Sequence, residues 1–193
     1  MGTRWSESCL ALAMLTLPAS SMGSDASSTP PAVTIAGQLE TSAGERPARF
    51  TLMCTTGSGG ALSLMLRVDP AGLSDFNFDV YEGPGAPAAA RPSAHLRVGN
   101  IKAPAARVAG WYGDESTQAP LPFTFGIASD AGKPGTTATI AAALAQTGTE
   151  LSWTQDNPTS GGKPLVGRFT LSRDESAQIA RIAAPCLPAK PRD

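Results

Sequence analysis

Apolar and polar side chains alternate along most of the chain after its N-terminal region, a pattern typical of strands that bury one face. The first such run covers 33–39 and is interrupted at Gly37. Two further runs, 50–54 and 62–68, alternate in the same way around a turn rich in Gly and Ser at 56–60. We therefore predict an early strand followed by a β-hairpin.

The most regular alternation of the whole chain lies at 75–80. Three apolar residues share one side and three polar residues the other, namely Phe76, Phe78 and Val80 against Asp75, Asn77 and Asp79. We predict a half-buried strand there, followed by a Pro- and Ala-rich loop at 83–92. Weaker alternation predicts further strands at 96–98, 108–112, 123–127, 151–154 and 165–171.

Two segments have helical rather than strand spacing. The Ala-rich stretch 137–146 predicts a short helix. A second helix is predicted at 174–183, where Ser172 and Glu175 have the spacing of a capping box and Pro185 ends the apolar pattern. The fold class is therefore mainly β, an antiparallel β sandwich or curved sheet with one or two short helices.

The first 21 residues have the three-part layout of a secretory signal peptide. A positive charge at Arg4 precedes a short apolar run at 9–17, and Pro and small residues follow it. Residues 22–31 are small and polar and suit a flexible spacer, which leaves one domain at 32–193. We expect a periplasmic or secreted protein with no stable membrane span after signal cleavage.

The cysteines agree with export. The chain has three, and removal of the signal peptide removes Cys9 and leaves Cys54 and Cys186. A pair of cysteines in an oxidising compartment most often forms a disulfide. We predict that this bond ties the C-terminal helix to the early hairpin.

Composition excludes some classes of ligand. The formal net charge is -1 with 16% charged residues, so no broad basic field suggests nucleic-acid binding. Asp75, Asn77 and Asp79 begin like a calcium loop, but Val80 stands where such a loop needs glycine. We predict no metal or cofactor, and the carboxylates of Asp75, Asp79 and Glu82 remain candidates for an oxygen-ligand binding site of another kind.

Two adjacent aromatic residues are the most suggestive binding feature. Trp111 and Tyr112 stand between two glycines in a predicted strand. Neighbouring strand residues face opposite sides of a sheet, so one ring is expected in the core and the other on the surface. An exposed ring of this kind is suited to contacts with sugars or proteins.

Signals of catalysis are few. His95 is the single histidine, and no G-x-S-x-G motif accompanies it. Ser160 and Lys163 have the spacing S-x-x-K, but the companion motifs of serine acyl enzymes are missing. A catalytic triad assembled in space remains open.

These observations favour a non-catalytic binding or interaction domain whose partner is a protein or small ligand at the cell envelope. A specific version is an enzyme inhibitor that presents the loop 83–92 or the loop 156–163. The alternative is a hydrolase of envelope polymers that acts through carboxylates or His95. A purely structural role, marked by a large exposed apolar patch, is the third hypothesis.

Overall fold

The strands of the described part of the chain form a single antiparallel sheet. The computed structural model describes residues 29–42, 44–56, 60–113, 121–129, 135–146 and 150–187. The strands are β1 (Ala32–Thr41), β2 (Gly44–Thr55), β3 (Ala61–Val68), β4 (Pro92–Val98), β5 (Ile101–Lys102), β6 (Ala106–Arg107), β7 (Ala109–Tyr112), β8 (Phe123–Ala128), β9 (Glu150–Gln155) and β10 (Leu165–Thr170). The helices are α1 (Thr136–Gln146) and α2 (Arg173–Ala183).

This sheet curves until its two edges are joined by the segment 106–112. The strand order is β5-β4-β9-β10-β1-β2-β3-β8-β7, and β6 pairs with β4. Only Val108 separates β6 from β7, so the segment 106–112 pairs with β4 through its first residues and with β8 through its last. The mainly β fold is confirmed, in its curved-sheet form rather than as a sandwich of two sheets.

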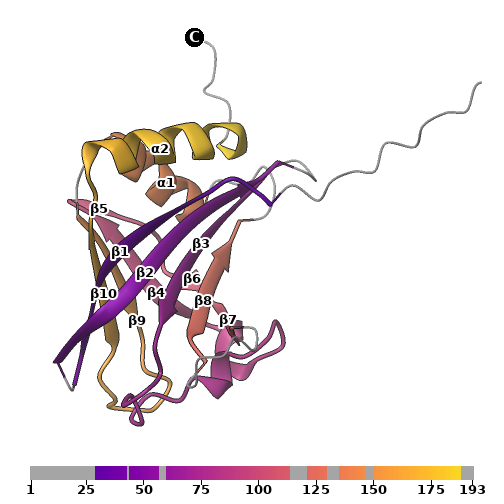
Figure 1. The fold of residues 1–193 in the computed structure, drawn as a ribbon. Coiled ribbons are helices and arrows are strands. Elements are labelled where there is room, and N and C mark those ends of the chain that lie inside the picture. Colours follow the sequence, from indigo (N-terminus) through magenta and orange to yellow (C-terminus); the bar gives the residue numbers. More distant parts are fainter. Residues whose placement is uncertain are drawn as a thin grey trace, which may run out of the picture.

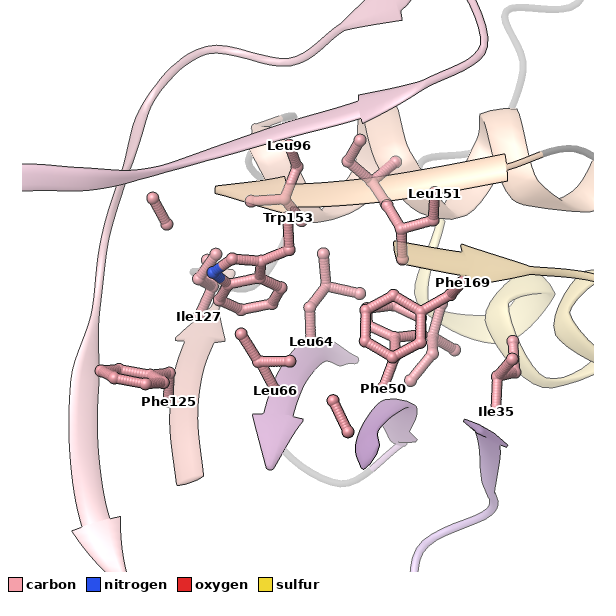
Figure 2. Packing of buried hydrophobic residues seen from close by; sticks show 14 of the residues in the cluster. Ile35, Phe50, Leu64, Leu66, Leu96, Phe125, Ile127, Leu151, Trp153 and Phe169 are labelled. Atoms are coloured by element: carbon pink, nitrogen blue, oxygen red, sulfur yellow. The ribbon is translucent and has the colours of Figure 1, made fainter. Parts of the chain in front are cut away.

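The inner side of the curved sheet holds the hydrophobic core. Figure 2 shows large side chains from many strands pointing into this interior. Phe50, Phe125, Trp153 and Phe169 are fully buried there. The helices α1 and α2 pack against each other and lie together across one end of the sheet (Figure 1). Strand alternation thus separates a dry inner side from an outer side that faces water.

The strand predicted at 75–80 does not form. The segment instead bends and enters a short 3-10 helix, η2 (Asp79–Tyr81). The side chain of Asn77 accepts a hydrogen bond from the N–H of Asp79 at 3.2 Å, which gives the backbone a local alternative to strand pairing. Phe76 and Phe78 are nevertheless buried, because both pack against Phe125.

Two smaller expectations also change. Strand β1 continues through Gly37 without interruption and pairs with β2 along its whole length. The loop predicted at 83–92 contains a second 3-10 helix, η3 (Pro87–Ala90).

The C-terminal part of the fold follows the sequence prediction. The Ser172 hydroxyl accepts a hydrogen bond from the N–H of Glu175 at 3.2 Å, and a Glu175 carboxylate oxygen accepts one from the N–H of Ser172 at 2.8 Å. This capping box starts α2, which leads into the 3-10 helix η4 (Ala184–Cys186). The disulfide between Cys54 and Cys186 is confirmed and ties this end of the chain to β2.

The proposed signal peptide, 1–21, lies outside the described residues, as does most of the spacer at 22–31. None of the helices in the described ranges is long and apolar enough to cross a membrane.

Candidate functional site

The two aromatic residues of β7 point to opposite sides of the sheet. Trp111 lies on the outer face, where 43% of its surface is exposed. Tyr112 lies on the inner side, half-buried against the ring of Phe123 with centroids 4.9 Å apart. The geometry therefore selects Trp111 as the ring available to a partner and gives Tyr112 a structural position.

The hydroxyl of Tyr112 is engaged inside the molecule. It donates a hydrogen bond to a carboxylate oxygen of Asp79 at 2.7 Å. Burial, together with this bond and the negative charge of Asp79, raises the pKa of Tyr112 to about 12. The phenol is therefore neutral at physiological pH. Its hydrogen bond engages one oxygen of Asp79, a carboxylate that the sequence suggested as part of a binding site.

The indole of Trp111 is supported from below by a glycine of the neighbouring strand. A Cβ placed on Gly126 of β8 would lie 2.7 and 2.8 Å from two atoms of the indole ring. Any larger residue at 126 would push the ring off the strand backbone. The ring therefore lies close against the backbone of β8, in space that the missing side chain of Gly126 leaves open.

Trp111 borders a hollow of about 660 Å³ on the outer face of β2, β3, β8 and β7. Met53 and Met65 supply its floor from β2 and β3, while Pro84 and Ala89 come from the loop 83–92. No Asp, Glu or His belongs to the lining found among the described residues. The described lining therefore offers mainly apolar and sulfur contacts, together with the side chains of Ser63 and Arg107.

Two of the three candidate carboxylates, those of Asp79 and Glu82, lie near Tyr112, since the charge of each raises its pKa. Asp75 accepts a hydrogen bond from the Ser42 hydroxyl at 2.9 Å, and Asp79 is bound by Tyr112. Glu82 forms a backbone bridge with Gly110. In the ranges that the structure describes, no group of three His, Cys, Asp or Glu side chains is placed to hold a metal ion.

His95 lies on the outer side of β4, away from the Trp111 hollow. Its Nε2 atom is 3.0 Å from a carboxylate oxygen of Asp156, and both side chains are about half exposed. It borders a separate hollow of about 500 Å³ together with Arg97 and Lys102. The structure thus brings His95 together with a carboxylate, Asp156, that was not a candidate, and places neither beside Trp111.

A pair of arginines on the outer face was missed by sequence reasoning. Arg49 of β2 stands directly opposite Arg67 of β3, and both are exposed. They line a hollow of about 870 Å³ that also includes Gln38 and Pro122. The alternation of the hairpin places residues 49 and 67 on its outer side, and only the register between the strands brings them face to face.

Comparison with known proteins adds no further constraint: no family model, no curated protein and no solved structure matches the chain.

Proposed function

We propose that this protein is an exported, non-catalytic domain that binds a partner protein through the outer face around Trp111. The observation that carries the proposal is the exposed indole, held on Gly126 beside an apolar hollow. Large exposed apolar residues are scarce in the described part of the chain, where Ile101 is the other example, at 46%. Together with the adjacent hollow, this exposed ring provides an apolar surface that a partner can contact.

The composition of this face supports a protein partner. Trp, Met and Arg are enriched in protein–protein interfaces, and Trp and Arg dominate their energetic hot spots. Trp111, Met53, Met65 and Arg107 all line the hollow. An exposed ring beside a hollow lined by flexible methionine side chains suits a partner's apolar side chain.

The form of an enzyme inhibitor follows if the loop 83–92 contributes to the same surface. Pro84 and Ala89 from that loop line the hollow beside Trp111. The loop 156–163 is instead tied to the segment around Asp75, because the side-chain amide of Asn157 donates a hydrogen bond to the backbone carbonyl of Asp75. The same amide also donates to the carbonyl of Lys163 within the loop. We therefore assign the contact to the loop 83–92.

Export is part of the same proposal. A disulfide that joins β2 to the C-terminal segment suits an oxidising compartment, and the signal-like residues 1–21 suit a periplasmic or secreted location. Recovery of a mature chain that lacks these residues from the periplasm or medium would support it. Recovery of the uncleaved chain in the cytoplasm with both thiols reduced would contradict it.

Site-specific cross-linking tests the binding surface. A photoreactive amino acid is placed at Ser63, which lines the hollow. The control places it at Arg181, an exposed position on α2 that is outside this surface. We expect a discrete cross-linked protein from position 63 in an extract of the source cells, and its loss when Trp111→Ala is added. Unchanged cross-linking in the Trp111→Ala chain, with its circular dichroism intact, would contradict the proposal.

A further inference from the structure

One row of residues crosses the outer face from β2 to β7. Arg49 stands opposite Arg67, Arg67 opposite Thr124, and Thr124 opposite Trp111. Neighbouring strands are about 4.8 Å apart, so the backbones of Arg67 and Trp111 are about 10 Å apart along this row. The backbones of Arg49, Arg67 and Trp111 therefore belong to one row on the outer face, and the indole of Trp111 lies beside this row, over Gly126.

The two arginines of this row face each other, and no described carboxylate forms an ion pair with either. Like charges placed directly opposite on neighbouring strands are destabilising. Neither Arg49 nor Arg67 forms an ion pair within the part of the chain that the structure describes, whereas Arg168 on the same outer face pairs with Glu40 and Glu150. The outer face thus holds one arginine with carboxylate partners, Arg168, and two for which no described partner is present, Arg49 and Arg67.

Among the described residues that line this hollow, Asp69 is the one carboxylate. Its Oδ1 atom accepts a hydrogen bond from the N–H of Ala71 at 2.9 Å, and two positive charges share the hollow with this single negative charge. The hollow, of about 870 Å³, leaves room for a group from outside the molecule. Its charge and its space both suit an incoming anion.

We propose that Arg49 and Arg67 bind carboxylates of an acidic segment of the partner protein whose apolar side chain contacts Trp111. This inference rests on the proposed function and adds the chemistry of the partner. The planar guanidinium groups suit carboxylates because each can donate two parallel hydrogen bonds. The acidic residues of the partner segment then lie about three positions from its apolar residue, since an extended chain advances about 3.3 Å per residue.

A short peptide of this design provides the direct test. The probe is acetyl-Phe-Gly-Gly-Glu-Glu-amide, and the matched control peptide carries Gln in place of both Glu residues. Binding to the oxidised full chain is followed by NMR through the arginine Nε–H signals and the indole N–H signal of Trp111. We expect saturable shifts at Arg49, Arg67 and Trp111, with the Gln peptide weaker by about fivefold or more.

Charge-removing variants locate the contact. Arg67→Gln is expected to weaken the acidic peptide by about fivefold or more, and Arg49→Gln to do the same. The control Arg181→Gln removes an equal charge from α2 and is expected to leave the affinity unchanged. Equal affinity of the unmodified chain and Arg67→Gln, or equal affinity for the Glu and Gln peptides, would overturn the proposal, as would the absence of saturable shifts.

A comparison of two polyanions distinguishes a protein partner from an anionic glycan. Heparin, a sulfated polysaccharide, is titrated against poly-glutamate of the same total charge. Similar affinities, or tighter binding of poly-glutamate, support a protein partner, while heparin binding at Arg49 and Arg67 about a hundredfold tighter would overturn it in favour of an anionic glycan. If the peptide binds through the arginines but cross-linking from position 63 does not depend on Trp111, the proposed function fails while the acidic-group site stands.

Discussion

The ring of Phe169 on β10 occupies the space in which a side chain at Gly37 of β1 would lie. A Cβ built at residue 37 would be 2.3 Å from both a ring carbon of Phe169 and the carbonyl oxygen of Arg168. The same ring packs against Phe50 with centroids 5.7 Å apart. Gly37 therefore leaves room for the aromatic side chain of Phe169 where β1 pairs with β10.

We predict that Gly37→Ala destabilises the domain by about 3 kcal/mol, because the new methyl group overpacks a rigid ring and a backbone carbonyl. Gly85→Ala is the matched control, since nothing lies within 4 Å of a Cβ at that position. Urea unfolding measures both changes. Adding Phe169→Leu to Gly37→Ala should recover part of the loss, and strictly additive effects would contradict the contact.

The sequence predicts most of this fold because most strands have one wet and one dry side. Strands such as β2, β3 and β10 show that division directly in their alternation. The segment 75–80 shows the same alternation for another reason, because a turn closed by Asn77 sends Phe76 and Phe78 inward. Alternation reports burial, and it does not distinguish a strand from a turn that buries every second residue.

Pairing between distant segments is the part that alternation does not contain. Closure of the sheet depends on the two-residue strand β6, which pairs with β4 beside Val108. The candidate site shows the same limit: Trp111 is recognisable from its neighbours, but Gly126 beneath it and the opposition of Arg49 to Arg67 follow from register. The alternation of residues predicts which face of the sheet a side chain lies on. The register between strands decides which side chains are its neighbours on that face.

Loss of the disulfide is expected to destabilise the domain strongly. Cys54 and Cys186 are 132 residues apart, and chain entropy assigns about 5 kcal/mol to a loop of that size. We predict a loss of about 3–5 kcal/mol in the Cys54→Ala/Cys186→Ala variant, measured by urea unfolding against the oxidised chain. Alkylation and intact-mass measurement of the untreated protein provide the control, and two alkylated thiols at these positions would contradict the bond.

Both tyrosines should titrate late in the folded protein. Burial raises the pKa of Tyr81, and burial with the Asp79 contact raises that of Tyr112 to about 12. Because the folded pKa of Tyr112 lies above the ordinary value of 10, its contribution to stability is complete below pH 10 and is lost as the pH rises towards 12. Absorbance at the phenolate band should therefore stay low at pH 10 until the chain unfolds.

The variant Asp79→Asn separates the two causes of the Tyr112 shift. Removing the negative charge should lower the pKa of Tyr112, but burial, the larger cause, should keep it above the ordinary value. A phenolate signal from the folded native chain near pH 10 would contradict the buried position of both rings.

Quenching of fluorescence reports the surroundings of Trp111. In a Trp5→Phe chain the remaining indoles are Trp111, which is 43% exposed, and Trp153, which is fully buried. Arg67 and Arg107 lie near Trp111, so iodide should quench its emission about twofold or more above caesium. Arg67→Gln should reduce this difference, and equal quenching by the two ions would argue against a cationic strip.

The disulfide and the pairing of β1 with β10 set the time at which the molecule can be completed. The ribosome makes β1 first, yet one of its two neighbours appears only after residue 165, and the sulfur that locks β2 comes still later, at Cys186. A growing chain therefore carries an apolar strand with one unpaired edge until β10 has been made. We expect this edge to need protection from aggregation during synthesis, and the fold to become stable only after β10 and Cys186 have been translated.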